Sequence, residues 1–154
     1  MKNKFKDKVV SIFLAMLLIV STFAVTGYAL TDELSTDDNH SFSFKIPANQ
    51  NQGRYTSGKF RSTTDHNNAW KVNFKTSNEP GTGNTYTKFS ICLNDGTLAS
   101  SWHTVQESSG AHYYAGNDWG DYITVYLHGK DNNNIASSYP VSGYWDEETG
   151  VAPA

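Results

Sequence analysis

The feature that most constrains this fold is a strict alternation of apolar and polar residues, which recurs in several short segments. It is clearest over residues 70–77, where Trp70, Val72 and Phe74 alternate with polar side chains. Successive side chains of a β-strand point to opposite faces of its sheet, so a period of two predicts a strand with one buried face. No segment after residue 30 keeps an apolar period of 3.6 residues, and Gly, Asn, Ser and Thr are too frequent for helices. The sequence therefore predicts an all-β fold.

Turn residues divide the alternating pattern into a series of short strands. The segment 54–63 is the weakest of them because Gly58 interrupts it, and Asn94-Asp95-Gly96 is a strong hairpin signal before the return strand. The segments that fit a strand are 41–46, 54–63, 70–77, 87–93, 98–107, 111–115, 121–128 and 135–145. Their number and spacing predict a single antiparallel β-sandwich of seven or eight strands, with no second domain and no internal repeat.

The N-terminal end has the pattern of a secretory leader. Four lysines fall within residues 2–8, an apolar run follows over residues 9–25, and Gly27 and Ala29 supply small residues before a cleavage point. An uncleaved membrane anchor is the alternative, because seventeen residues are at the short limit for crossing a bilayer. The predicted organisation is a signal peptide at 1–29, a flexible acidic lead-in at 30–40, the sandwich at 41–149 and a short tail at 150–154.

Charge and cysteine content narrow the class of protein further. Residues 30–154 carry eight basic and fourteen acidic side chains, a net charge of −6, which argues against a nucleic-acid partner. Cys92 is the only cysteine, so no intramolecular disulfide can form and the core itself must stabilise the domain.

Aromatic side chains are the main candidates for both core and ligand binding. Residues 30–154 contain 17 of them, and the alternation assigns Trp70 and the five phenylalanines to the core. The segment 111–122 is predicted to be a hairpin whose turn, 116–120, presents Trp119 to solvent beside acidic residues. The ligand-binding candidates lie beside turns and acidic residues: Tyr114, Asp118, Trp119, Asp121, Tyr144 and Trp145.

Metal and cofactor sites are not expected from the sequence. Asn117, Asp118 and Asp121 place three oxygen-bearing side chains on one turn, but calcium needs six to eight oxygens and these are ordinary turn residues. The run Asp131–Asn134 lacks the glycine of a calcium loop, and the five histidines show no close ligand spacing.

An enzymatic reading has little support from motifs. The sequence contains no nucleophile elbow, phosphate-binding loop or dinucleotide fingerprint. Asp146-Glu147-Glu148 is interpreted as a solvated turn, and Cys92 lies within a strand, on its polar side, where its exposure stays open.

Three segments carry a resemblance to a known family. SGAHYYAG at 109–116, WKVNF at 70–74 and SGYWDEETG at 142–150 resemble segments of a family of small exported proteins from Gram-positive bacteria, catalogued as a domain of unknown function. The resemblance implies an extracellular, compact single domain and supplies no catalytic residues.

These observations lead to one functional expectation and two alternatives. We expect a secreted, non-enzymatic protein that binds a cell-surface or wall glycan or a partner protein, with no membrane contact once the leader is removed. The alternatives are a secreted antibacterial or toxin-like protein and a small secreted hydrolase with an unrecognised site.

Overall fold

The described part of the chain is built from nine β-strands. The computed structural model describes residues 38–81, 83 and 85–154, so the predicted signal peptide and the lead-in up to residue 37 lie outside the described residues. The strands are β1 (His40–Ile46), β2 (Gln52–Arg54), β3 (Lys59–Arg61), β4 (Trp70–Ser77), β5 (Tyr86–Cys92), β6 (His103–Gln106), β7 (Ala111–Tyr114), β8 (Ile123–Asp131) and β9 (Tyr139–Asp146). The described residues contain no α-helix, and among them no helix is long and apolar enough to cross a bilayer.

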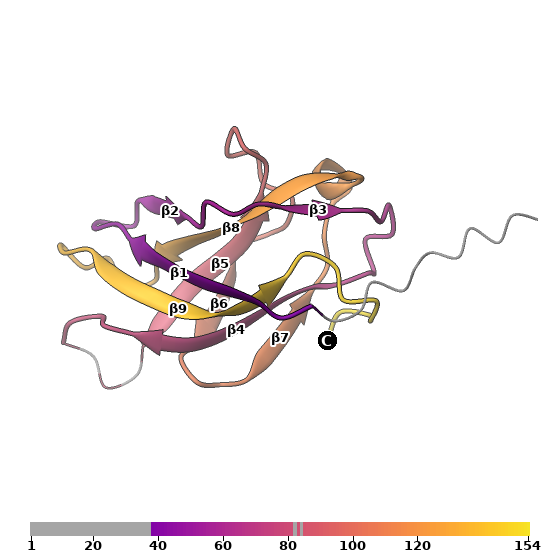
Figure 1. The fold of residues 1–154 in the computed structure, drawn as a ribbon. Helices are drawn as coiled ribbons and strands as arrows, with labels where there is room; N and C mark the ends of the chain where they lie inside the picture. Colours follow the sequence, from indigo (N-terminus) through magenta and orange to yellow (C-terminus); the bar gives the residue numbers. More distant parts are fainter. Residues whose placement is uncertain (1–37, 82, 84) are drawn as a thin grey trace, which may run out of the picture. The chain divides into compact units, whose positions relative to one another are not determined.

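The strands form two antiparallel sheets that pack face to face (Figure 1). The first sheet has the order β1-β9-β4-β7, and the second has the order β2-β8-β5-β6 with β3 also paired to β8. Every strand pairing in both sheets is antiparallel. The prediction of an all-β sandwich is therefore confirmed.

The core consists of inward-facing residues from both sheets, several of which the alternation identified. Trp70, Val72 and Phe74 of β4 are fully buried, as are Phe89 and Ile91 of β5. Further buried members come from the remaining strands: Phe42, Ile46, Val105, Val125, Leu127, Tyr139, Val141 and Trp145. Packing of this apolar surface is the main source of stability for a domain without a disulfide.

Phe60 is an exception to the predicted core. Phe60 is 50% exposed, whereas Phe42, Phe74 and Phe89 are buried and Phe44 packs against the core. The assignment of Phe60 to the core was wrong because β3 is a three-residue edge strand whose inward position belongs to Arg61. Three residues are too few for alternation to reveal which face is buried.

Several strand boundaries differ from the sequence prediction because pairing decides where a strand ends. Segment 54–63 is not one strand, because it contains β3 and only the last residue of β2, and these two strands pair with different stretches of β8. The return strand β6 begins only at His103, and Leu98 contributes an isolated bridge to Cys92. β8 continues through Gly129 to Asp131, so the last strand begins at residue 139.

The segment 111–122 is not a hairpin. β7 pairs with β4 in the first sheet, while β8 pairs with β5 in the second, so the chain crosses between sheets over residues 115–122. A short 3₁₀-helix, η1 (Asp118–Gly120), lies in this crossover. The hairpin prediction failed because alternation identifies strands but not the sheet that each one joins.

Both ends of the described chain are attached to the sandwich. The backbone N–H of Asp38 donates to Asp146 Oδ2 at 2.7 Å, and β1 begins at His40. In the predicted tail, the carbonyl of Val151 accepts from Ala69 at 2.9 Å. Residues 38–40 and the start of the tail are thus parts of the domain.

Candidate functional site

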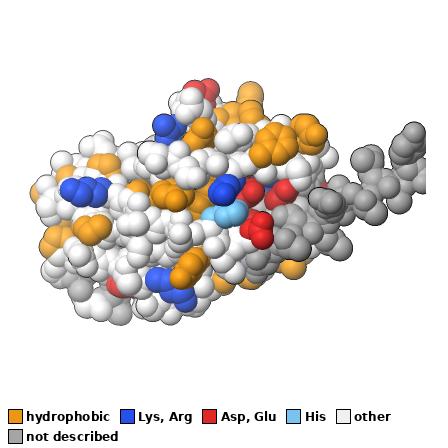
Figure 2. Space-filling view, in the orientation of Figure 1, with side chains coloured by type: hydrophobic (Ala, Val, Ile, Leu, Met, Phe, Trp, Pro, Cys, Tyr) orange, Lys and Arg blue, Asp and Glu red, His pale blue; other side chains and the backbone are white. Residues whose placement is uncertain are grey.

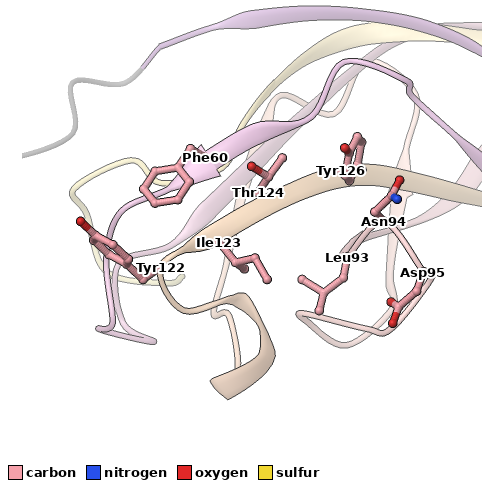
Figure 3. Close-up of a pocket in the computed structure, with 8 residues that line it drawn as sticks. All are labelled: Phe60, Leu93, Asn94, Asp95, Tyr122, Ile123, Thr124 and Tyr126. Carbon is pink, nitrogen blue, oxygen red and sulfur yellow. The ribbon is translucent and has the colours of Figure 1, made fainter.

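An open groove with aromatic walls lies where β3 and the start of β8 face the turn after β5. Its cavity volume is about 520 Å³ (Figure 3). The lining residues come from β3, β8, the crossover and this turn: Phe60, Leu93, Asn94, Asp95, Tyr122, Ile123, Thr124 and Tyr126. We call it the aromatic groove. Figure 2 shows hydrophobic side chains together at the upper right of this face, in the region of β3 and the start of β8.

Two exposed rings form one end of the aromatic groove. Phe60 and Tyr122 are 50% and 68% exposed and pack edge to face, with ring centroids 5.1 Å apart. Phe60 points outward because its neighbour Arg61 occupies the inward position and is fully buried. Tyr122 has a φ of 49°, a left-handed conformation that interrupts the backbone just before β8. It therefore does not continue the strand, which corrects the prediction that β8 would begin before this residue.

The opposite end of the groove is held by a guanidinium group. Arg54 Nη1 donates to both the carbonyl and the side-chain oxygen of Asn94, each at 2.9 Å. The same guanidinium lies over the Tyr126 ring, 4.8 Å from its centroid. These contacts hold Asn94 and Tyr126 in place at this end of the groove. Both side chains line the groove, where a ligand could contact them.

Hydrogen-bonding groups stand at the rim of this apolar surface. The turn after β5 closes by a hydrogen bond from the Gly96 N–H to the Leu93 carbonyl at 3.0 Å. Hydrogen bonds from Thr97, chiefly its backbone N–H, lower the pKa of Asp95, so a charged carboxylate stands beside the groove. A concave apolar surface with a few polar groups is the usual composition of a binding site.

A second cluster lies in the crossover between the sheets and contains three of the predicted ligand residues. Trp119 is 64% exposed, which confirms its predicted presentation to solvent. His66 Nε2 lies 3.1 Å from Asp118 Oδ1 and 3.2 Å from Asp121 Oδ2. The Asn117 side chain caps η1 by accepting from the Trp119 N–H at 3.1 Å. His66, one of the five histidines without close ligand spacing in the sequence, therefore lies beside two of the predicted aspartates.

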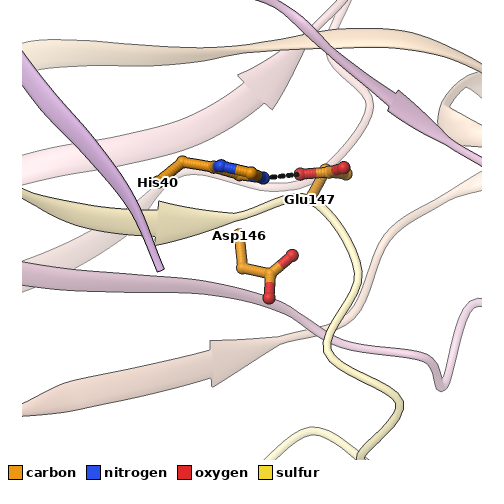
Figure 4. Close-up of side chains that lie close together, drawn as sticks. All are labelled: His40, Asp146 and Glu147. Atoms are coloured by element: carbon orange, nitrogen blue, oxygen red, sulfur yellow. Dashed lines mark ion pairs between the residues drawn. The ribbon is translucent and has the colours of Figure 1, made fainter. Parts of the chain in front are cut away.

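A third cluster surrounds the acidic segment at the end of β9. His40 Nε2 lies 3.4 Å from Glu147 Oε2, with Asp146 beside them (Figure 4). Burial raises the pKa of Asp146 to about 6 and that of Glu147 to about 7. In Figure 2 a histidine, a basic side chain and several acidic side chains lie together at the centre of this face.

The acidic segment 146–148 is not a solvated turn. Asp146 is fully buried and Glu148 is 5% exposed. Glu148 accepts hydrogen bonds from the N–H groups of Ser62 and Thr63 at 3.0 and 2.9 Å, so it anchors the loop after β3. The solvated prediction was wrong because a local sequence does not show which buried donors the fold brings to a carboxylate.

The remaining predicted ligand residues do not join these clusters. Trp145 is fully buried in the core, which contradicts its choice as an accessible ligand residue. Alternation places it inward, on the opposite face of β9 from Tyr144, which is 42% exposed. Tyr114 stacks on His103 with ring centroids 3.8 Å apart and packs against Trp70. Its ring thereby bridges the two sheets at their edges.

Cys92 is a packed residue. It is fully buried, and burial raises the pKa of its thiol to about 11, so the thiolate needed for nucleophilic attack is disfavoured. On the same face of β5, Ser90 Oγ donates to the Ser100 carbonyl at 3.0 Å, so the chain that follows the strand covers this face, which sequence parity alone could not reveal.

Sequence reasoning missed the aromatic groove. Phe60 was placed in the core and Tyr122 in a strand, and both errors come from assuming that alternation continues to the end of a segment. The usable signal was Gly58, which interrupts the pattern two residues before Phe60. A Cβ on Gly58 would lie 2.6 Å from the Tyr126 ring, so this glycine permits close packing beside the groove.

Comparison with known proteins places the chain in one family. No curated protein and no solved structure matches it significantly. The family model of DUF2712, described as "protein of unknown function", matches residues 25–149, which include all nine strands. The chain therefore belongs to the DUF2712 family.

Proposed function

We propose that the protein is exported and binds a cell-surface or wall glycan through the aromatic groove. The single observation that carries the proposal is the edge-to-face pair of Phe60 and Tyr122, both at least half exposed, beside a concave surface. Large apolar rings are costly to leave in water, and exposed apolar patches of this kind commonly mark interaction sites.

A sugar fits the chemistry of the groove. The C–H-rich face of a pyranose stacks on an aromatic ring, and its hydroxyl groups donate to carboxylate and amide oxygens. Tyr122 and Phe60 supply rings, and Asp95 supplies a charged acceptor. The 68% exposure of Tyr122 leaves most of its ring accessible without a rearrangement of the core.

The carboxylate content of the groove favours binding over catalysis. Among the described residues that line it, the only carboxylate is Asp95, and a glycosidase needs two carboxyl groups held across the scissile bond. The carboxyls with raised pKa, Asp146 and Glu147, belong to the cluster with His40 and do not line the groove.

Export is supported by the N-terminal pattern. Four lysines precede an apolar run at residues 9–25, and the family match begins at residue 25, after most of that run. An extracellular domain with a glycan-binding groove and no disulfide is consistent with this arrangement.

A sedimentation assay tests the proposal. Purified protein is mixed with insoluble wall polymer, and both co-sedimentation and release of soluble fragments are measured. We expect co-sedimentation without release, and we expect Phe60→Ala combined with Tyr122→Ala to abolish it. Tyr144→Ala is the matched control, because it removes a partly exposed ring that does not line the groove.

Each other outcome points to a different function. Release of fragments by the wild type would establish a hydrolase. Loss of binding after protease treatment of the polymer would identify a partner protein as the target. Unchanged co-sedimentation of the groove double variant, or absence of binding by the wild type, would overturn the proposed role of the groove.

A further inference from the structure

The cluster of His66, Asp118 and Asp121 brings together donors from two separate loops. His66 lies between β3 and β4, and both aspartates lie in the crossover between β7 and β8. One nitrogen and two carboxylate oxygens all lie within 4.8 Å of one another. We propose that these three side chains form a zinc-binding site, a function separate from glycan binding in the groove.

The distances suit a small tetrahedral ion. Bonds of about 2.0–2.1 Å to nitrogen and oxygen place neighbouring ligand atoms about 3.4 Å apart in a tetrahedron. The separations of His66 Nε2 from the carboxylate oxygens of Asp118 and Asp121 are 3.1 and 3.2 Å. These two separations need to change by only a few tenths of an ångström to accommodate the ion. The two carboxylate oxygens lie within 4.8 Å of each other, and side-chain rotation can adjust that third separation.

The identity of the donors favours zinc over calcium. Calcium takes six to eight oxygen ligands, whereas imidazole is a common ligand of zinc. The third oxygen-bearing side chain of the turn, Asn117, is already used: its oxygen accepts from the Trp119 N–H and its nitrogen donates to the Leu98 carbonyl. The turn thus lacks the oxygens of a calcium site.

An oxygen without a hydrogen-bond partner provides an independent indication of a ligand. Asp121 Oδ1 is inaccessible to solvent and accepts no hydrogen bond within the described structure, although Oδ2 faces His66. An unpaired buried carboxylate oxygen is costly. Arg61 compensates part of the charge of Asp121, and a cation held by both aspartates would compensate the rest.

One positive charge nearby, the buried guanidinium of Arg61, opposes metal binding. The guanidinium of Arg61 donates to the carbonyls of Glu147, Asp65 and Asn68. The carboxylates of Glu148 and Asp121 both lie close enough to interact with it electrostatically, so Arg61 already compensates part of the charge of Asp121. Asp118 is not among the described carboxylates that interact with Arg61, and its charge is the main attraction for a cation.

Zinc bound here would retain an open coordination position. Three protein ligands leave a fourth place for water or for an oxygen of a ligand. Asp118 has a 90% exposed side chain and adjoins the exposed Trp119, so that position faces solvent. The ion would also connect the loop after β3 to the crossover that carries Tyr122.

Metal titration of the purified protein tests the proposal. Bound Zn²⁺ is measured by calorimetry and, after removal of free metal, by elemental analysis, and Co²⁺ is added separately as a spectroscopic probe. We expect one ion per chain and a tetrahedral cobalt spectrum that zinc abolishes. We expect Ca²⁺ at the same concentration not to compete.

Variants assign the ligands. His66→Ala and Asp121→Asn should each weaken zinc binding by roughly 100-fold or more, because loss of even an outer partner of a metal ligand costs 10–100-fold. His112→Ala is the matched control, since this histidine contacts Ser109 outside the cluster. Circular dichroism of each variant without metal verifies that the fold is retained.

Two results would overturn the site. One is the absence of stoichiometric zinc uptake by the wild type. His66 would then only pair with Asp118 and Asp121 and would not bind a metal. The other is unchanged uptake in folded His66→Ala. If a variant fails to fold, Asp118→Asn substitutes for it, because the 90% exposed side chain of Asp118 makes that change structurally mild.

Discussion

Gly58 lies directly against the ring of Tyr126. A Cβ built on Gly58 would be 2.6 Å from Tyr126 Cε1 and 2.8 Å from a methyl group of Thr124. Both contacts belong to residues that line the aromatic groove. The absence of a side chain at position 58 therefore determines where one wall of the groove can lie.

Gly58→Ala should displace Tyr126 and weaken glycan binding. Overpacking commonly costs about 1–3 kcal/mol, so the free energy of unfolding should decrease by an amount in that range. Gly83→Ala is the control, because no atom lies within 4 Å of a Cβ at that position. Denaturant unfolding and co-sedimentation measure the two effects, and binding equal to wild type would show that the position of Tyr126 is unimportant.

Trp119 and Trp145 should respond oppositely to truncation. Trp145→Ala removes a fully buried ring and should cost about 3–5 kcal/mol of stability. Trp119→Ala removes a ring that is 64% exposed and should cost less than about 1 kcal/mol, a shift in melting temperature of a few degrees. Thermal unfolding of both variants checks this contrast, and a large loss for Trp119→Ala would place its ring in the core.

Glu147 should make the protein less stable as the pH rises toward neutrality. Burial raises its pKa from 4.5 to about 7, so the folded state holds more protons than the unfolded state between these values. The stabilising contribution is present below about pH 4.5 and is lost as the pH rises through about 7. Asp146, with a pKa raised to about 6, acts in the same direction.

The variant Glu147→Gln isolates this contribution. It should flatten the dependence of unfolding free energy on pH between about 5 and 7, and at pH 8 it should be more stable than wild type by about 3 kcal/mol. Urea unfolding at a series of pH values measures both quantities. A profile parallel to that of wild type would show that Glu147 titrates normally.

His128 should destabilise the fold in acid. It is 6% exposed, neither ring nitrogen has a hydrogen-bond partner within the described structure, and burial lowers its pKa from 6.5 to about 4. Its contribution to stability is present above about pH 6.5 and is lost as the pH falls through about 4, because the imidazole must become charged. His128→Leu should reduce this acid-induced loss, measured against His112→Ala, and an unchanged acid transition would contradict the assignment.

The sequence alone determined the class of fold and most of the core. Alternation over residues 70–77 and 87–93 predicts β4 and β5 because each strand must bury one face, and this constraint acts within the strand itself. Trp70, Phe74 and Phe89 are buried as predicted. The exposure of Trp119 was also predicted from the sequence, because no apolar alternation includes this residue. The flanking glycines were not a valid reason, since Gly120 is itself buried.

Only the tertiary structure decided how these pieces meet. Whether β7 and β8 pair with each other or lie in different sheets depends on partner strands distant in the sequence. Their placement in different sheets brings His66 to Asp118 and Asp121. The opposite environments of Tyr144 and Trp145, and of Phe60 and Arg61, likewise follow from which face of each strand meets the other sheet. Burial of the Glu148 carboxylate depends on donors from the β3–β4 loop, because satisfaction of a buried polar group is a property of the assembled fold.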